Sequence, residues 1–412
     1  MNLEQSDQGR QLLEDVKSFM EDHIYPNEAQ YDTEMRELTE AGDPHGYPPI
    51  MDKLKAQARE RGLWNMFLPH LDPDAPGTKL SNVDYAYVAE ELGRVGFSSE
   101  VFNCSAPDTG NMELINLYGT EEQKERWLAP LLDGEIRSAF AMTEPRVASS
   151  DASNIETQMV RDGDDYVING LKWMISGAMA ERCKVLVVMG KTDPSASRHL
   201  QQSMILVPKD HPGVKVVRSI TVFGYEDRGG HPEVEFDDCR VPTNWLLGEE
   251  GGGFAMSQAR LGPGRIHHCM RTIGVAERAL TLMVQRAGQR TTFGRDVIQQ
   301  GLIQDWIAES RIEIDMLRTY VLRCAYMMDT VGNKAAATDI SGIKVAAPNV
   351  ALKVIDRAIQ VHGAAGVSQD TKLANMYAHM RTLRIADGPD EVHKMTIARR
   401  EIKKHYPDFR MG

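Results

Sequence analysis

The stretch from Arg384 to His393 contains the strongest candidate for acid–base chemistry in this sequence. It places the carboxylate of Asp387 directly before Gly388 and Pro389, a pair that ends helices and forces turns. A carboxylate at such a turn can point into a cleft instead of along a solvated helix face, which suits a general base. The alternative is an aspartate that only caps a helix or stabilises a turn, and this stretch by itself favours that alternative.

Four further stretches contain residue types that suit a flat, phosphate-bearing ligand. The first two provide hydroxyls, backbone donors and an aromatic for a ring with polar edges. The third places an arginine beside an aromatic, for a phosphate and a stacked base, and the fourth has glycines that permit close backbone approach. Each also has a structural interpretation, as a strand turn, a hairpin, a surface arginine or a helix cap, but their joint occurrence favours a ligand site. The stretches are Ala139–Pro145 with Ser149–Asp151, Asn169–Gly177, Gln289–Gly294 with Gln304, and Gln360–Gly366.

Composition limits the class of protein. The 412 residues are 42% hydrophobic and 26% charged, which is typical of a globular protein with two or three domains. A net charge of -12 argues against a nucleic-acid-binding surface. The five cysteines lack metal-site spacing, so we expect reduced thiols and no metal. Because there is neither a targeting segment nor an apolar run of roughly 20 residues, we expect a cytoplasmic protein without a membrane span.

The spacing of apolar residues predicts three regions, in the order helical, β and helical. In the first region we expect a loop around Gly42–Pro49 and a capping box at Thr120. The predicted helices are Leu12 to Pro26, 51–62, 82–93, 109–118 and 121–132.

Short strands are expected in the middle of the chain, at 183–189, 203–208, 214–217 and 233–236, and Asn169-Gly170 is a hairpin-turn signal. No helices alternate with these strands, so a Rossmann sheet is not expected. Long apolar stripes after Phe254 predict a helical bundle, with the glycine-rich run Gly248–Gly253 as its entry.

With this layout the chain resembles the acyl-CoA dehydrogenase family over essentially its whole length. Thr143-Glu144-Pro145 with Ser150-Asp151 resembles the first family signature, and Leu261–Cys269 and Ala386–His393 are similar to the branch of family members ten and eleven. The resemblance implies an α+β fold of acyl-CoA dehydrogenase type. Its expected parts are a helical N-terminal domain at 1–137, a β-barrel-like middle domain at 138–243 and a C-terminal four-helix bundle at 244–412.

The resemblance also implies bound FAD and a set of contacts to it. The pyrimidine side of the flavin would be lined by Phe140, Met142 and Thr143, and its reactive edge by Ile175 and Ser176. The pyrophosphate and adenosine half would be contacted by Arg290, Phe293 and Gln304, and the FAD of a neighbouring subunit by Gln360 and Gly363. The substrate would be contacted by Ser150, Arg265 and Gly388. Such an enzyme would be a homodimer or homotetramer.

The implied reaction is α,β-dehydrogenation of an acyl-CoA to the trans-2-enoyl-CoA, a step of fatty acid β-oxidation. Asp387 would remove the α-proton, the β-hydrogen would leave as hydride to the flavin, and an electron-transfer flavoprotein would accept the electrons. The family usually has a glutamate at this position, whereas the narrower branch has aspartate. Some members place the base just before the arginine equivalent to Arg265, where this chain has Gly264. Either Trp173 or Met174 would cover the flavin.

Three other functions stay open as alternatives. The first is an oxidase that passes electrons to oxygen. The second is a DNA-associated flavoprotein of the same superfamily, which the net charge disfavours. The third is a catalytically silent scaffold that binds flavin or CoA, which the retained carboxylate disfavours. The length and branching of the acyl chain are not determined by these motifs.

Overall fold

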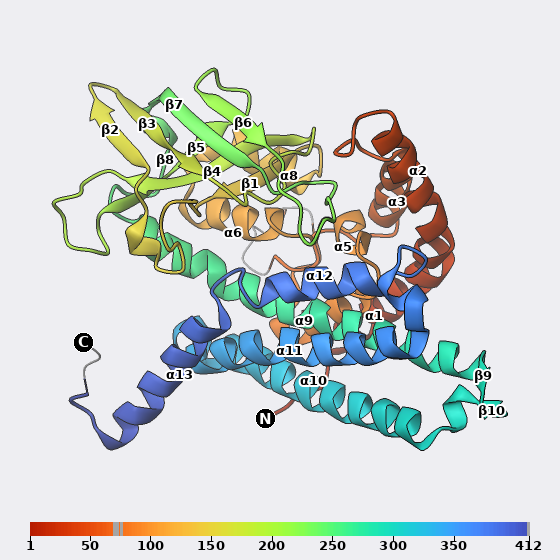
Figure 1. Cartoon of the computed structure of the whole chain (residues 1–412). Coiled ribbons are helices and arrows are strands. Elements are labelled where there is room, and N and C mark those ends of the chain that lie inside the picture. The colour runs from red at the N-terminus through yellow and green to blue at the C-terminus, as the bar shows by residue number, and fades with distance from the viewer. Residues whose placement is uncertain (69–73, 75–76, 410–412) are drawn as a thin grey trace. The chain divides into compact units, whose positions relative to one another are not determined.

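The computed structural model describes residues 1–68, 74 and 77–409. The chain forms two compact units, each built from separated segments. One unit, mainly helical, comprises Met1–Asp22, Leu80–Ser99 and Gly262–Gly412. The other, which contains the large sheet, comprises His23–Lys79 and Glu100–Leu261 (Figure 1).

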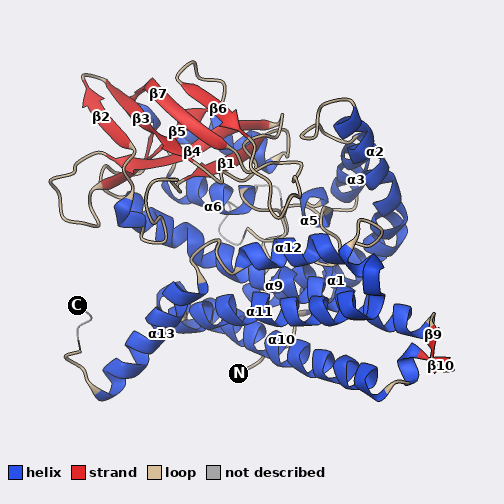
Figure 2. Ribbon diagram, in the orientation of Figure 1, coloured by secondary structure: helices blue, strands red, loops and turns tan. Residues whose placement is uncertain are grey.

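Helices make up most of the described chain (Figure 2). They are α1 (Asp7–Phe19), α2 (Glu28–Glu40), α3 (Pro49–Glu60), α4 (Asn82–Leu92), α5 (Ser98–Val101), α6 (Asp108–Tyr118), α7 (Glu121–Gln123), α8 (Ala129–Leu132), α9 (Gly253–Gly288), α10 (Gly301–Ala335), α11 (Ala337–His362), α12 (Leu373–Leu383) and α13 (Asp390–His405). The strands are β1 (Arg137–Ala141), β2 (Gln158–Asp162), β3 (Asp165–Lys172), β4 (Cys183–Lys191), β5 (Gln202–Pro208), β6 (Val214–Arg218), β7 (Glu233–Pro242), β8 (Leu246–Leu247), β9 (Thr291–Thr292) and β10 (Arg295–Asp296).

Helix α2 is the clearest error of the sequence-based prediction for the N-terminal region. No helix was predicted between Pro26 and the loop at Gly42, whereas residues Glu28–Glu40 are helical. Tyr31, Met35 and Leu38 have helical spacing and are half-buried, but no residue of α2 is fully buried. The apolar signal of this helix is therefore weak among its polar residues. The helices expected at 51–62, 82–93 and 109–118 are confirmed as α3, α4 and α6.

The capping box predicted at Thr120 is present at the start of α7. The Gln123 amide donates to Thr120 Oγ1 at 3.3 Å, and the Thr120 amide donates to Gln123 Oε1 at 3.1 Å. The two residues therefore satisfy each other's backbone donors, as this motif requires.

The sheet has the strand order β6-β7-β3-β2-β4-β5-β8, and β1 pairs with β4 in parallel. Strand β4 is the most apolar, because every residue from Val185 to Met189 is buried. In the register of β1 with β4, Phe140 lies opposite Val187 and Ala141 opposite Val188. The end of β1, where the first predicted ligand-binding stretch begins, is thus anchored to a buried strand of the unit.

Asn169 and Gly170 do not form the predicted hairpin turn. Both lie inside β3, and the connection from β2 to β3 falls instead at Gly163 and Asp164. A Cβ atom at position 170 would lie 2.4 Å from Thr157 Oγ1, so glycine is required there by close packing and not by a turn. The pairing of β3 with β7 also shifts register between Ile168 and Gly170.

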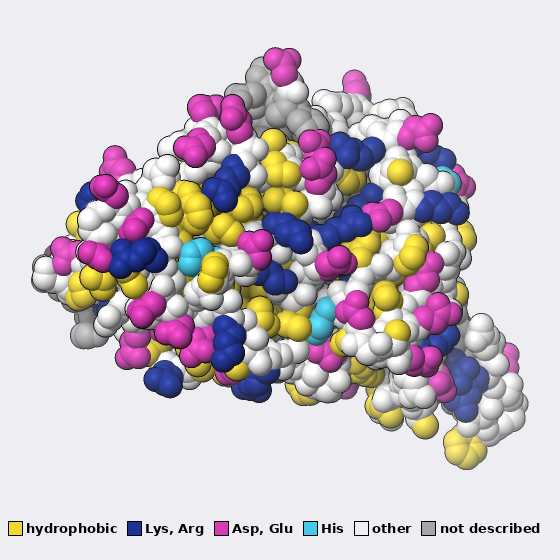
Figure 3. Space-filling view, turned by 90° about the horizontal axis from the view of Figure 1, so that it is seen from above, with side chains coloured by type: hydrophobic (Ala, Val, Ile, Leu, Met, Phe, Trp, Pro, Cys, Tyr) yellow, Lys and Arg dark blue, Asp and Glu magenta, His cyan; other side chains and the backbone are white. Residues whose placement is uncertain are grey.

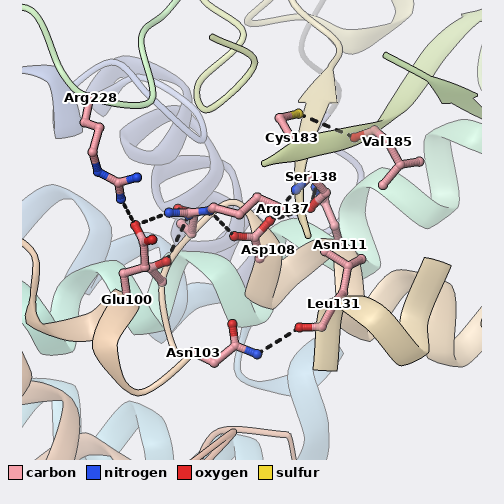
Figure 4. Close-up of polar contacts among 12 residues, drawn as sticks. Glu100, Asn103, Asp108, Asn111, Leu131, Arg137, Ser138, Cys183, Val185 and Arg228 are labelled. Carbon is pink, nitrogen blue, oxygen red and sulfur yellow. Dashed lines mark hydrogen bonds and ion pairs between the residues drawn. The ribbon is translucent and has the colours of Figure 1, made fainter. Parts of the chain in front are cut away.

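A buried ion-pair network joins the helices of this unit to the start of β1 (Figure 4). The Glu100 carboxylate pairs with Arg137 and Arg228, and Arg137 Nε lies 2.8 Å from Asp108 Oδ2. Asp108 Oδ1 accepts hydrogen bonds from the Ser138 amide and hydroxyl, each at 2.7 Å. Burial would raise the pKa of Glu100, but its cationic neighbours hold that pKa well below the usual range. The carboxylate is therefore ionised.

The apolar stripes predicted for the C-terminal region are buried between α10 and α11. Leu317 and Val321 of α10 and Ile343 and Val354 of α11 are 3% exposed or less. Helix α11 also packs against α12 and α13, which precede and follow the turn that carries Asp387. Packing against α11 thus fixes the two helices that flank the turn of the candidate base.

Within the described residues, no helix has both the length and the apolar character needed to cross a bilayer. All five cysteines are free and buried. On the face seen in Figure 3, basic and acidic side chains are interspersed and do not form one basic surface.

Candidate active site

Asp387 lies in the turn between α12 and α13, in the left-handed region of backbone conformation, with φ at +55°. Gly388 follows with φ at +101°, and a Cβ atom there would lie 2.8 Å from His393 Nε2. Only glycine fits that position without displacing the histidine. Pro389 occupies the N-cap position of α13. The turn predicted from these three residues is therefore present.

Side chains from neighbouring elements close this turn. Asp390 Oδ2 accepts hydrogen bonds from Arg384 Nε at 2.8 Å and from Asn349 Nδ2 at 3.0 Å. Lys344, which is 1% exposed, donates to the carbonyl of Leu383 and to that of Gly388. These contacts hold the backbone on both sides of Asp387. They therefore fix the position of its Cα atom, to which the carboxylate side chain is attached.

Asp387 itself is held through both its backbone and its carboxylate. Its carbonyl accepts a hydrogen bond from Arg265 Nε at 2.9 Å and lies 3.2 Å from His393 Nε2. Its Oδ2 atom lies 3.3 Å from His268 Nε2, and its side chain is 20% exposed. Arg265, for which a substrate contact was predicted, thus contacts the loop of the candidate base.

Gly264 borders the same carboxylate. A Cβ atom at position 264 would lie 3.8 Å from Asp387 Oδ2, which is an ordinary van der Waals contact. A side chain at this position would therefore begin beside the candidate base. The two alternative positions for the base, separate in the sequence, are neighbours in this unit.

The first two predicted ligand-binding stretches meet in the sheet-containing unit. The Trp173 amide donates to the Thr143 carbonyl at 3.0 Å, and Thr143 Oγ1 donates to the Trp173 carbonyl at 2.6 Å. Below them, Lys172 Nζ donates to the Met142 carbonyl at 2.9 Å and pairs with Glu144 Oε1 at 2.8 Å. Burial lowers the pKa of Lys172 to about 8, against the opposing effect of Glu144.

The residues that follow Trp173 differ in their surroundings. Ile175 is fully buried, whereas Ser176 is exposed. Ser176 Oγ lies 2.9 Å from His231 Nδ1, and His231 Nε2 lies 2.7 Å from Asp227 Oδ2. The hydroxyl expected near the reactive edge of the flavin is therefore the end of a chain of three hydrogen-bonding side chains.

Phe140 and Ser150, two residues of this unit that were predicted to contact ligands, are less buried than Ile175. The Phe140 ring is covered by the Arg260 guanidinium, whose central carbon lies 4.2 Å from the ring centroid. Ser150 is exposed, beside Asp151, which caps a short turn and pairs with Arg198. Ser150 is thus accessible to a ligand.

The third and fourth stretches meet in the helical unit. Gly363 has φ at +64°, and a Cβ atom there would lie 3.9 Å from Arg290 Nη1. Phe293 is 98% exposed at the turn between β9 and β10, and Gln304 and Gln360 are exposed on α10 and α11. An open cavity of about 380 Å³ borders both stretches and is lined by residues that include Arg286, Gln289, His362 and Thr371.

The chemistry of these groups fits FAD. An arginine beside a glycine with positive φ suits a diphosphate, because the guanidinium donates in a fixed fork and the backbone can approach closely. Phe293 offers an exposed aromatic face to a planar base. In the other unit, the buried Ile175 and Met142 beside the paired Thr143 and Trp173 offer an apolar surface with polar backbone edges.

Several residues of the site were not predicted from the sequence. His268 lies three residues after Arg265 on α9, so both face the same side of one helix, and this spacing was a usable signal. Lys344 is 44 residues from Gly388 and His231 is 55 residues from Ser176, so no local pattern connects them.

Comparison with known proteins identifies one family over nearly the whole chain. Models of the acyl-CoA dehydrogenase N-terminal, middle and C-terminal domains match residues 6–135, 139–239 and 251–402. The chain is 55% identical over 395 residues to Probable acyl-CoA dehydrogenase FadE2 of Mycobacterium tuberculosis, covering 96% of this chain and 95% of that protein. It is 54% identical to human Acyl-CoA dehydrogenase family member 11, covering 97% of this chain but 51% of that protein.

Solved structures show the same relationship. A Mycobacterium abscessus structure assigned to the acyl-CoA dehydrogenases is 47% identical, with a TM-score of 0.94 and coverage of 98% of this chain and all of that one. The acyl-CoA dehydrogenase from Geobacillus kaustophilus is 29% identical, with a TM-score of 0.79 and coverage of 96% of this chain and 98% of that one. The chain belongs to the acyl-CoA dehydrogenase family.

Proposed function

We propose that this chain oxidises the Cα–Cβ bond of an acyl-CoA thioester to the trans-2-enoyl-CoA, with Asp387 as the base that removes the α-proton. Family membership makes it an FAD-dependent oxidoreductase. The assignment of the base rests on the contacts that hold Asp387. A short carboxylate is held at a left-handed turn by contacts to its carbonyl and to one of its oxygens.

The first task of the chain's own residues is to place the base. An α-CH beside a thioester is a very weak acid, so the carboxylate must sit close to the proton, and about 1 Å of misplacement can cost on the order of a hundredfold in rate. Arg265 and His393 fix the carbonyl of Asp387, and Lys344 fixes the next peptide. These contacts fix the backbone from which the side chain, one methylene shorter than glutamate, must reach the proton.

The second task is to hold the cofactor and keep water away from it. When bound, FAD supplies the redox chemistry by accepting the hydride from Cβ. Met142, Thr143, Ile175 and Ser176 would hold its ring system, and Arg290 and Phe293 its phosphates and adenine. The burial of Ile175 and the low exposure of Met142 support a dry surface on one side of the reaction.

The partners follow from this reaction. The acyl-CoA is the substrate, and an electron-transfer flavoprotein accepts the electrons. The exposure of Phe293, Gln304 and Gln360 supports contact with a second copy of the chain in a homodimer or homotetramer. The free and buried cysteines support a reducing compartment such as the cytoplasm.

The variant Asp387→Asn tests the base, because it keeps the shape of the side chain and removes its basicity. We expect this variant to retain FAD. We also expect anaerobic flavin reduction, measured by absorbance with acyl-CoAs of several chain lengths, to slow by about 10²–10⁴-fold. Glu391→Gln, a change at an exposed neighbour on α13, is the matched control and keeps the normal rate. Normal flavin reduction in Asp387→Asn would contradict the assignment of Asp387 as the base.

The oxidase alternative is tested on the same preparation. A dehydrogenase whose reduced flavin is protected from oxygen forms little hydrogen peroxide in air. Rapid peroxide formation, matched to acyl-CoA consumption, would instead establish the oxidase.

A further inference from the structure

Two side chains of α9 and the candidate base in the turn between α12 and α13 form a continuous polar chain. Arg271 Nη2 lies 3.2 Å from His268 Nδ1, and His268 Nε2 lies 3.3 Å from Asp387 Oδ2. Arg265, His268 and Arg271 follow one another at intervals of three residues, so they share one side of the helix. All of these residues belong to the helical unit.

The direction of the hydrogen bonds in this chain follows from its first member. A guanidinium has donors and no acceptor, so Arg271 donates to His268 Nδ1, and that nitrogen carries no proton. The single proton of a neutral imidazole is then on Nε2, which donates to the Asp387 carboxylate. The imidazole therefore acts as a donor of defined orientation.

The surroundings of His268 favour this neutral form. The groups around it are Asp387 from the loop, Arg271 from its own helix and Lys344 from α11, with Cys269 and His393 close to the same carboxylate. Burial lowers the pKa of His268, the hydrogen bond to Asp387 opposes this change, and the Arg271 charge adds to the lowering. Two cations near an imidazole make a third positive charge unfavourable.

We propose that His268 is a positioning residue, whose Nε2–H holds the Asp387 carboxylate in the orientation for α-proton removal while Arg271 holds the imidazole. This inference rests on the proposed role of Asp387 as the base.

A neutral donor has a specific advantage here. A cation paired directly with the carboxylate would weaken it as a base, because an opposite charge stabilises the ionised form more strongly than a neutral hydrogen bond does. Arg265 Nε contacts the carbonyl of Asp387, whereas His268 Nε2 contacts its Oδ2 atom. The carboxylate can thus be fixed in place with a smaller loss of basicity.

The test compares two substitutions in the holoenzyme. His268→Gln retains an amide N–H that can donate to Asp387 and a carbonyl that can accept from Arg271, whereas His268→Leu retains only volume. The measurement is the rate of anaerobic flavin reduction at saturating acyl-CoA as a function of pH. His267→Phe, on the same helix with its ring against Tyr85, is the matched control for the loss of a histidine.

We expect His268→Leu to reduce the rate at saturating substrate by about ten- to a hundredfold, with little change in KM. We also expect the acid limb of its pH profile to move up by about one pH unit, because a carboxylate without its donor takes up a proton more readily. His268→Gln should stay within about threefold of wild type, with an unmoved acid limb. A profile of His268→Leu that matches that of His267→Phe would overturn the positioning role.

A second measurement does not depend on turnover. In holoenzyme labelled with ¹⁵N-histidine, the His268 signals are assigned by their absence from His268→Gln. We expect an unprotonated Nδ1 and a protonated Nε2 at neutral pH, and the opposite tautomer or an imidazolium would overturn the inference. Normal activity of Asp387→Asn would instead remove the proposed function itself. An inactive Asp387→Asn with an unaffected His268→Leu would remove only the positioning role.

Discussion

The buried ion pair between Lys172 and Glu144 allows a test of what stabilises the predicted flavin-binding part of the site. The two side chains are 0% and 4% exposed, and they join the end of β3 to the loop after β1. The perturbation is Lys172→Met, which keeps an unbranched apolar stem and removes the ammonium. It leaves the Glu144 carboxylate buried without its cation and removes the hydrogen bond to the Met142 carbonyl.

Breaking a buried ion pair from one side costs about 3–5 kcal/mol. Glu144 keeps three other donors, the Glu156 amide at 2.7 Å and the amide and hydroxyl of Thr157 at 2.9 and 2.6 Å. These donors stabilise the carboxylate, so we expect the lower end of the range, about 3 kcal/mol. A domain of 150–250 residues loses about 2–4 °C per kcal/mol, which corresponds to a melting temperature lower by about 6–12 °C.

The assay is thermal unfolding of the holoenzyme and the apoenzyme, together with the flavin content of the purified protein. Lys172→Met combined with Glu144→Gln should recover part of the stability, because it removes the unpaired charge. Lys184→Met, at an exposed position of β4, is the control for the loss of a lysine. A fall of less than about 2 °C in Lys172→Met, with normal flavin content, would refute the reasoning.

Three other predictions concern pH, stability and the position of the base. Burial lowers the pKa of His267 to about 3. The unfolded chain therefore binds a proton that the folded chain does not, from roughly pH 6.5 downwards. Stability should fall by up to about 1.4 kcal/mol per pH unit over this range, and a comparison of melting temperatures between pH 7 and pH 4 should show a smaller loss in His267→Phe. Glu100→Gln leaves the surrounding cations without their buried carboxylate. It should lower the free energy of unfolding, measured with denaturant, by about 3–5 kcal/mol. A decrease below about 1 kcal/mol would contradict the ionised network. Gly264→Glu should restore part of the flavin reduction lost in Asp387→Gly, because a Cβ atom at position 264 would lie 3.8 Å from the Asp387 carboxylate. No gain in the double variant over Asp387→Gly would refute the idea that a base at position 264 can replace Asp387.

The order of helical and β regions was determined by local patterns in the sequence. Apolar periodicity identified α3, α4 and α6, because burial of one face imposes its period on the residues. Continuous apolar runs identified β4 and β5, which are buried on both faces. The turn at Asp387 was also a local feature, since glycine permits the positive φ that Gly388 adopts and proline fixes φ in the next residue. Helix α2 was missed because only Tyr31, Met35 and Leu38 mark its helical period, and none of them is fully buried.

Tertiary structure decided the parts of the site that depend on residues far apart in the chain. Gly170 looked like a turn residue, but its role is to let β3 pass close to Thr157. Lys344 reaches the turn at Asp387 from α11, and His231 reaches Ser176 from a separate loop, at separations where no periodicity operates. The sequence therefore determined which residue types were available for the chemistry, and folding determined which of them contact the base, because hydrogen bonds across elements depend on packing.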